Sequence, residues 1–422
     1  MTNGAQAAGA PWLRQAQPER AGGHHDPDSV RPGPERVGGH QDPASVRPGP
    51  EREGGRQDPG SVRPGPEREG GHQDPDPVRP ELVEGQNGAQ AALRPAQLGF
   101  LGVGWIGRHR MQALLQDGAA QALLLCDSDP ASLNAAAALA PAARTLPGAL
   151  DLPAGLPLDG LVIATPSALH AAQARAALEA GLAVFCQKPL ARTAAETRAV
   201  IEAAQRADRR LGVDLCYRHT AAARAVAAQV RSGELGEVYA IDLVFHNAYG
   251  PDKAWFRDPA LAGGGCLIDL GTHLVDLALW VMDFPVADEA SARLYAQGRR
   301  LGPAPDEVED HALAQFTLAP GTSVRLACSW NLSAGRDAVI EAHFHGTRGS
   351  ARMTNVDGSF YDFVAERCHG TRAERLAGPP DDWGGRAAVQ WARAVATGGR
   401  FDAEAWQALR VAELLDQLYG RA

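Results

Sequence analysis

One apolar stretch of the chain carries ionisable side chains along a single stripe. Residues 263–282, GGGCLIDLGTHLVDLALWVM, are typical of a helix, and Asp269, Thr272, His273 and Asp276 fall on one side of it. Leucine, isoleucine and valine cover most of the rest, whereas a surface helix normally has a broad polar face. A carboxylate and an imidazole four residues apart are neighbours on a helix. The stripe therefore faces either water or a cavity in which these groups do chemistry.

The scarcity of lysine makes the two lysines of this chain informative. Lys188 and Lys253 are the only lysines among 41 basic residues. An ammonium group can have its pKa tuned and can pass a proton, which a guanidinium in practice cannot. Lys188 stands at the end of an apolar strand in FCQKPLA, where a ligand is expected, and a solvated surface lysine is the alternative. For Lys253, chance survival is equally open.

A glycine-rich turn joins the first strand to the first helix. Gly102, Gly104 and Gly107 form G-x-G-x-x-G in GFLGVGWIG, with Trp105 and Ile106 between them. This spacing after a strand and before a helix favours dinucleotide binding, because the glycines let the backbone approach a pyrophosphate at the helix N-terminus. We therefore expect all five residues to contact a cofactor. A glycine-rich turn without a ligand is the alternative.

The end of the second strand bears on the choice of cofactor. Asp127 occupies that position, and a carboxylate there accepts both ribose hydroxyls and repels a 2′-phosphate. We expect NAD rather than NADP. A simple turn residue in DSDP is the alternative, and Ser128 leaves NADP open.

Further candidates follow the next two strands. Ligands of parallel sheets bind outside the carboxyl ends of the strands, so these residues are expected on the nicotinamide side. Ser167 is also expected to cap the helix that it begins. For His170, local packing is the alternative to cofactor binding. The cofactor candidates at these strand ends are Thr165, Pro166, Ser167, His170, Gln187 and Lys188.

The chain divides into a tail and two domains. Residues 1–94 are rich in Gly and Pro, and VRPGPER recurs at residues 30, 46 and 62. This segment is too poor in apolar residues to form a core, which indicates disorder. Because NGAQAA occurs at residues 3–8 and again at 87–92, we interpret the tail as an inserted, dispensable repeat element.

Strand and helix patterns alternate over residues 95–218, which predicts an α/β domain with a parallel sheet, a Rossmann dinucleotide-binding domain. Residues 219–422 contain long alternating strands and predict an α+β domain with a large, mostly antiparallel sheet, closed by a last helix. Its uncovered face would suit self-association, so we expect a homo-oligomer, a dimer or tetramer formed through this sheet.

Composition limits the possible partners. A net charge of −9 argues against nucleic acid. No apolar run reaches the length of a membrane span and no signal sequence opens the chain, so we expect a cytoplasmic protein without a membrane partner. Six single cysteines without a C-x-x-C pair predict neither a disulfide framework nor a metal site.

In their order, these motifs resemble the Gfo/Idh/MocA family of oxidoreductases, named for glucose–fructose oxidoreductase and inositol dehydrogenase. The resemblance covers residues 97–420 and includes GxGxxG, TPxxxH, (E/Q)KP and GGGxxxDxxxH. Gln187 departs from it, because many members have Glu there, and Lys188 then lacks one neighbouring negative charge.

The resemblance implies a cofactor-dependent site in which Lys188, Asp269 and His273 meet. We expect an NAD-dependent dehydrogenase of a sugar, polyol or related cyclic substrate. His273 would be the general base, Lys188 would stabilise charge on the reacting oxygen, and Asp269 would orient a hydroxyl or the imidazole.

Residues of the sugar pocket are harder to identify from sequence. Arg218 is the strongest candidate because it follows the fifth strand, and His219 adjoins it. Lys253, Trp255 and Arg257 precede the GGG turn, and the aromatic ring of Trp255 would suit a sugar ring. A packing or surface role is the alternative for each.

Two other functions stay open at this point. The resemblance also allows an NAD-dependent glycosidase, in which the cofactor is reduced only transiently. A non-enzymatic NAD-sensing regulator on the same scaffold is the other alternative, although such a protein need not keep Lys188, Asp269 and His273 together.

Overall fold

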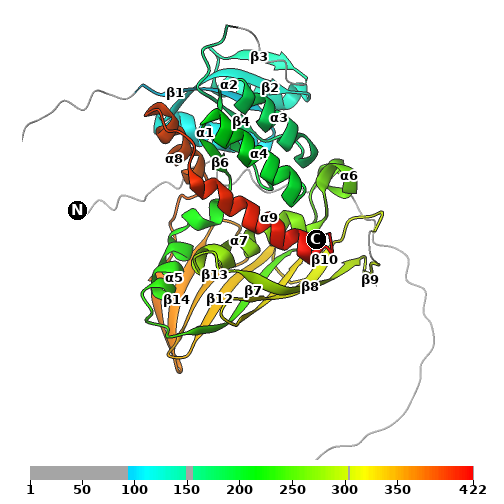
Figure 1. Cartoon of the computed structure of the whole chain (residues 1–422), viewed down its shortest axis with the longest axis vertical. Coiled ribbons are helices and arrows are strands. Elements are labelled where there is room, and N and C mark those ends of the chain that lie inside the picture. The colour runs from blue at the N-terminus through cyan, green and yellow to red at the C-terminus, as the bar shows by residue number, and fades with distance from the viewer. Residues whose placement is uncertain (1–93, 149–154, 303–304, 422) are drawn as a thin grey trace, which may run out of the picture. The chain divides into compact units, whose positions relative to one another are not determined.

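The computed structural model describes residues 94–148, 155–302 and 305–421. The predicted disordered tail, residues 1–94, thus lies outside the described residues except for Arg94. The described residues belong to one unit of the chain and build two β-sheets with helices packed on them (Figure 1).

The first sheet is wholly parallel, as predicted. Its order is β3-β2-β1-β4-β5-β6. The chain adds strands outward on one side as far as β3 and then continues on the other side with β4 next to β1. The inner strands are short, continuous apolar runs such as GLVI and AVFC, which is typical of strands covered on both faces. The strands are β1 (Ala96–Leu101), β2 (Ala120–Asp127), β3 (Arg144–Pro147), β4 (Gly160–Ile163), β5 (Ala183–Cys186) and β6 (Leu211–Val213).

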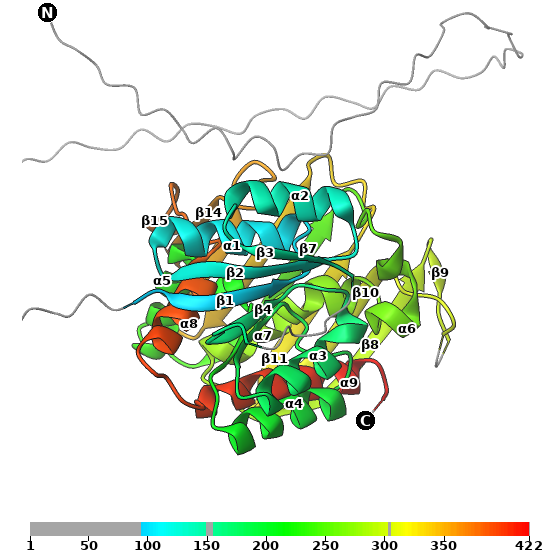
Figure 2. The same cartoon turned by 90° about the horizontal axis from the view of Figure 1, so that it is seen from above.

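Helices cover both faces of this sheet (Figure 2). Three of them share one apolar cluster on one face, and three share another cluster on the opposite face. The first group is α1 (Trp105–Asp117), α2 (Pro130–Leu139) and α8 (Arg386–Ala396), and the second is α3 (Ser167–Glu179), α4 (Ala194–Ala207) and α9 (Trp406–Leu418). Helix α8 comes from the segment that the sequence assigned to the second domain, and its Trp391 packs against the ring of Phe185.

The second sheet has the order β15-β14-β13-β12-β7-β11-β10-β8-β9 and is antiparallel except for the pair β7 and β11. Buried and exposed side chains alternate along its strands, as expected when one face packs on a core and the other is open. The strands are β7 (Val238–Asn247), β8 (Ala287–Ala296), β9 (Arg299–Arg300), β10 (His311–Leu318), β11 (Thr322–Ser329), β12 (Ala338–Gly346), β13 (Ser350–Asn355), β14 (Phe363–His369) and β15 (Arg372–Ala377).

Helices pack on the face of the second sheet that turns toward the first (Figure 1). The stretch with the ionisable stripe begins with the π-helical turn η4 (Leu267–Gly271) and continues as α7 (Thr272–Val281). It lies in the main apolar cluster of this half. Helices η2 (Cys216–His219) and α5 (Ala221–Arg231) share this cluster. The remaining short helices are η3 (Ala254–Arg257), α6 (Pro259–Ala262) and η5 (Ala403–Ala405), and Ala405 of η5 packs in the cluster of the first sheet.

The expectation that no apolar run reaches the length of a membrane span is wrong. Among the described residues, Pro259–Val281 is long and apolar enough to span a bilayer, with a mean hydropathy of 1.3. The structure explains this composition, because 89% of its most apolar window of 18 residues is buried inside the protein. Such a helix is apolar almost all round because it lies in a core.

Candidate active site

The predicted cofactor residues lie along one edge of the first sheet. The turns after β1, β2, β4 and β5 all leave the carboxyl ends of parallel strands. The reversal of strand order between β1 and β4 opens a crevice there, which is the usual ligand site of such sheets. This edge therefore carries the glycine-rich turn, Asp127, residues 165–170 and Lys188.

The three motif glycines differ in what surrounds them. Gly102 has a φ of +79°, and a side chain there would collide with the backbone at Ala164. A side chain on Gly107 would collide with the carbonyl oxygen of Gly102. In contrast, a Cβ on Gly104 would meet no atom within 4 Å. Gly102 and Gly107 are thus required by the fold, whereas the open space at Gly104 fits the close approach of a pyrophosphate.

The start of α1 and the end of β2 also offer polar groups to a dinucleotide. Gly104 is the N-cap of α1, and no side chain caps the helix or places an acidic group in its first turn. Its N–H groups therefore suit an anion. Asp127 accepts hydrogen bonds from the backbone N–H of Val103 at 2.7 Å and of Asp129 at 2.9 Å. A carboxylate has about four acceptor positions, so Asp127 retains capacity for ribose hydroxyls.

The residues after β4 hold the turn that carries Lys188, but none of their side chains caps α3. The expected cap by Ser167 is wrong, because Pro166 is the N-cap of α3 and no side chain caps it. The two ring nitrogens of His170 lie 2.7 Å from the carbonyl oxygen of Thr165 and 2.8 Å from that of Pro189. This buried imidazole thus braces the turn that carries Lys188.

Lys188 and the ionisable stripe meet directly. The Nζ atom of Lys188 donates to Oδ1 of Asp269 at 2.6 Å and to its carbonyl oxygen at 2.8 Å. Both side chains are largely buried, at 18% and 15% exposure. The other carboxylate oxygen of Asp269 accepts from Nε1 of Trp330 at 3.1 Å. Sequence reasoning missed Trp330, which follows β11 and reads as a core residue.

His273 lies one turn further along the helix, buried against the ring of Tyr217 at 4.7 Å between ring centroids. Burial and then the positive charges of Lys188 and Arg110 hold the pKa of His273 well below its usual value. The ring is therefore neutral near pH 7. Nδ1 of His273 is buried and has no hydrogen-bond partner among the described residues.

A buried polar network supports the lysine turn from the other side. The side-chain amide of Gln187 donates to Oδ2 of Asp214, which also accepts from Nε of Arg110 at 2.6 Å. Asp214 is fully buried and Arg110 is 4% exposed. Gln187 therefore turns toward Asp214, and the negative charge beside Lys188 comes from Asp269. No motif indicated Arg110 or Asp214: Arg110 follows another arginine and a histidine on a helix, and Asp214 stands alone in an apolar segment.

Arg218 serves the helix that carries the stripe. Its guanidinium donates to both carboxylate oxygens of Asp276, one at 2.8 Å, and to Gln407 at 2.6 Å. It also lies over the ring of Phe284. Burial raises the pKa of Asp276, and Arg218 opposes this shift. Asp276 of the stripe is therefore the ion-pair partner of Arg218. The guanidinium of Arg218 is engaged in holding this helix, which is a structural role and not that of a sugar ligand.

The segment before the GGG turn contributes aromatic rings. Trp255 stacks on Phe256 with centroids 3.8 Å apart, and Phe256 meets Trp330 edge-on at 6.3 Å. This row leads from the half-buried Trp255 to the partner of Asp269. The side chain of Lys253 is 64% exposed and lies 3.8 Å from Asp252, so it belongs to the surface.

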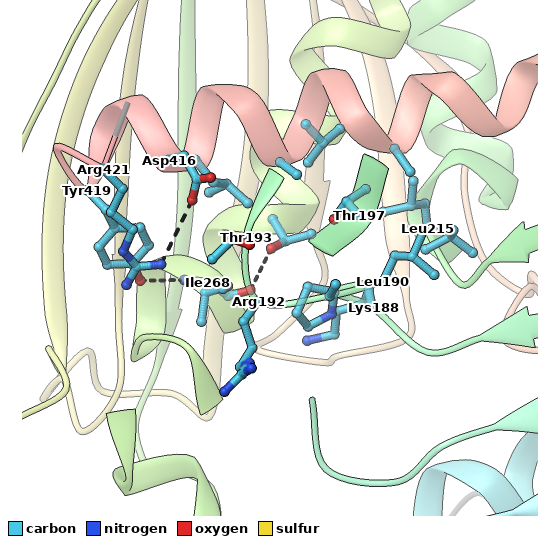
Figure 3. A pocket seen from close by; sticks show the side chains of 18 residues that line it. Lys188, Leu190, Arg192, Thr193, Thr197, Leu215, Ile268, Asp416, Tyr419 and Arg421 are labelled. Atoms are coloured by element: carbon cyan, nitrogen blue, oxygen red, sulfur yellow. Dashed lines mark hydrogen bonds and ion pairs between the residues drawn. The ribbon is translucent and has the colours of Figure 1, made fainter. Parts of the chain in front are cut away.

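A small hollow lies on another side of Lys188 (Figure 3). Ile268 and Thr272, the turn 188–193 and helix α9 line it, whereas Asp269 and His273 do not. The hollow is therefore distinct from the contact between Lys188 and Asp269. Among the described residues, no group of three or more His, Cys, Asp or Glu side chains is placed to hold a metal ion.

The sheet order, the open glycine turn and the buried lysine–aspartate pair define a nucleotide-binding oxidoreductase fold. Residues 96–215 match the oxidoreductase family with an NAD-binding Rossmann fold, and residues 223–352 match the Gfo/Idh/MocA C-terminal domain. An oxidoreductase subunit from Amycolatopsis mediterranei is 31% identical over 269 residues, 60% of this chain and 73% of the relative. The chain belongs to the Gfo/Idh/MocA family of oxidoreductases, which confirms the resemblance.

Other relatives match over a smaller share of their length. D-glucoside 3-dehydrogenase from Escherichia coli is 28% identical over 46% of this chain and 58% of its own. Levoglucosan dehydrogenase from Pseudarthrobacter phenanthrenivorans is 30% identical over 44% of this chain and 53% of its own. The alignments thus span a little over half of these two relatives.

Solved structures agree in fold. Levoglucosan dehydrogenase in complex with NADH and L-sorbose aligns with a TM-score of 0.63 at 24% identity, covering 78% of this chain and 97% of that chain. A 3-ketoreductase from Actinomadura kijaniata in complex with NADP and TDP-benzene aligns with a TM-score of 0.67 at 20% identity, covering 78% and 98%.

Proposed function

We propose that this protein is an NAD-dependent dehydrogenase that oxidises a secondary hydroxyl of a sugar, polyol or related cyclic compound, or reduces the corresponding ketone. The observation that carries the proposal is the buried pair of Lys188 and Asp269 beside the neutral imidazole of His273. Relatives named D-glucoside 3-dehydrogenase, levoglucosan dehydrogenase and inositol 2-dehydrogenase support this substrate class.

The residues of the sheet edge fit a nicotinamide dinucleotide. The open space at Gly104 and the uncapped start of α1 suit the pyrophosphate, and Asp127 suits the adenosine ribose. When bound, the nicotinamide would accept the hydride from the substrate carbon. A carboxylate at Asp127 disfavours a 2′-phosphate, so kcat/KM with NAD is expected to exceed that with NADP. Equal or reversed values would contradict this preference.

Lys188 has one N–H left for the substrate. Its ammonium group has three donors, and two of them are directed to Asp269. The third can donate to the reacting oxygen, where it would stabilise the negative charge that develops during oxidation. Asp269 keeps free acceptor capacity as well, so it can orient a neighbouring hydroxyl of the substrate while it fixes the lysine.

His273 would take the hydroxyl proton. Its pKa is held well below the usual value by burial and by Lys188. The imidazole is thus uncharged at neutral pH and can accept a proton as the alcohol is oxidised. In the direction of ketone reduction the same ring would return the proton. The row of Trp255, Phe256 and Trp330 would offer apolar faces to the C–H bonds of a sugar ring.

A screen of sugars and polyols with NAD, followed by the absorbance of NADH, tests this proposal. Net NADH formed from a free sugar or polyol supports a dehydrogenase. Cleavage of an aryl glycoside without net NADH would instead establish a glycosidase of the same fold. Cofactor binding without turnover on any substrate would indicate a regulator. Either of the last two results overturns the proposal.

The open face of the second sheet is the proposed oligomer interface. Tyr239 is 57% exposed and Leu313 is 44% exposed, both on strands of this sheet. We include in the proposal a dimer or tetramer formed through this face, and the cytoplasm as its compartment. Light scattering of the purified protein should give a multiple of the chain mass that Leu313→Glu reduces, and cell fractionation checks the compartment. A monomeric wild type would contradict the interface.

A further inference from the structure

The helix that carries Asp269 and His273 begins against a buried carboxylate. Glu309 is 1% exposed, and its carboxylate accepts from the N–H of Gly265 at 3.0 Å and of Leu267 at 2.9 Å. Its own carbonyl oxygen accepts from the N–H of Cys266 at 2.9 Å. Three successive backbone donors are thus held by one residue. Their partial positive charge at a helix start matches the carboxylate.

The C-terminal segment adds the fourth contact. The hydroxyl of Tyr419, just beyond α9, donates to Oε1 of Glu309 at 2.7 Å and accepts from the N–H of Ile268 at 3.0 Å. Figure 3 shows Tyr419 and Ile268 next to each other. The guanidinium of Arg421 lies 4.1 Å from the ring centroid of Tyr419 and covers it.

Two glycines of the GGG turn are required by this arrangement. A Cβ on Gly264 would collide with the hydroxyl of Tyr419, and a Cβ on Gly265 would collide with the carbonyl oxygen of Glu309. The turn therefore approaches both residues as closely as a backbone can. The four held N–H groups, residues 265–268, end immediately before Asp269.

We infer that Glu309 and Tyr419 form a clamp that positions Asp269 and His273 relative to Lys188. The inference rests on the proposed dehydrogenase function. The helix starts with a π-helical turn over Leu267–Gly271, so its backbone is irregular where the reactive side chains begin. The clamp fixes this start to the segment before β10 and the segment after α9, and a shift there would displace both side chains together. Glu309 and Tyr419 are positioning residues, because they act through the backbone of the helix.

Removing the hydroxyl of Tyr419 tests the clamp. In Tyr419→Phe, kcat should fall about tenfold or more, because small displacements of reacting groups are costly, while the Kd for NADH stays within about twofold. Hydrogen exchange of the amides over residues 265–273, followed by mass spectrometry, should become faster. Glu309→Gln keeps one of the two acceptor oxygens and should show the same two changes.

Thr322→Val is the matched control. Thr322 is 2% exposed and its hydroxyl donates to the carbonyl oxygen of Val238 at 2.7 Å, in the same half of the molecule. This variant also loses one buried hydroxyl, but it should leave kcat and exchange over 265–273 unchanged. Equal exchange in Tyr419→Phe and the control would overturn the clamp, as would faster exchange with unchanged kcat. A wild type without turnover would overturn the proposed function instead, and the exchange comparison would still decide whether the clamp holds the helix.

Discussion

Replacing Lys188 by methionine removes the ammonium while keeping a flexible apolar stem. The variant loses two hydrogen bonds to Asp269, at 2.6 and 2.8 Å, and leaves that carboxylate with Trp330. Breaking a fully buried ion pair costs about 3–5 kcal/mol. Because these side chains keep 18% and 15% exposure, we expect a smaller loss of unfolding free energy, about 1–3 kcal/mol.

The effect of Lys188→Met on catalysis should be larger than the effect on stability. Loss of one preorganised donor to a developing negative charge lowers kcat by about 10²–10³-fold. The same ammonium lowers the pKa of His273, so its removal should raise that pKa. A general base works only when neutral, above its pKa. The acid limb of the kcat/KM profile for alcohol oxidation, expected below pH 6.5 in the wild type, should therefore move to higher pH in the variant.

Three assays separate the possible effects. Initial rates across pH report catalysis, NADH titration reports cofactor binding, and urea unfolding reports stability. Lys253→Met is the matched control, because Lys253 is the other lysine of the chain and its side chain is 64% exposed. The control should keep kcat within about twofold, since surface charges contribute little. Turnover of Lys188→Met within about threefold of wild type, at unchanged NADH affinity, would refute the role of Lys188.

Three further predictions concern the supporting structure. Gly104→Ala should weaken NADH binding at unchanged Tm, because its Cβ meets no protein atom. Gly107→Ala should instead lower Tm, because its Cβ collides with the backbone. Equal effects of the two variants in both assays would contradict a pyrophosphate site at Gly104. Arg218→Ala leaves Asp276 as a buried charge without its partner and should cost about 3–5 kcal/mol in urea unfolding; a loss below about 1 kcal/mol would contradict the structural role. Gln187→Glu places a second carboxylate in a buried site and should destabilise the fold by about 2 kcal/mol or more. The pKa of this new carboxyl would lie above its unfolded value, so the loss should grow as pH rises, and a pH-independent effect would contradict the network.

The sequence was sufficient for the parts of the fold with a strong local pattern. Alternation of strand and helix patterns was enough to predict a parallel sheet over residues 95–218, and long alternating strands predicted a mostly antiparallel sheet over residues 219–422. The segments FVAERCH and RAERLA of β14 and β15 carry few apolar residues in alternation, so they give a weaker strand signal. The return of α8 to the first sheet depends on tertiary packing, which periodicity does not encode.

The candidate site shows the same division. The family resemblance implied that Lys188 and Asp269 meet, and the structure has them in direct contact. Trp330 was missed because a tryptophan after a strand is more often a core residue. The direction of Gln187 and the ion pair of Arg218 were not foreseen, because side-chain partners far apart in sequence leave no local signal.

A structure of the protein with NADH and a substrate found in the screen would decide whether Lys188 and His273 act on the same atom. We expect the reacting oxygen to lie about 2.6–3.2 Å from both Nζ of Lys188 and a ring nitrogen of His273. An oxygen held by other groups, with the ammonium and the imidazole both out of reach, would contradict it.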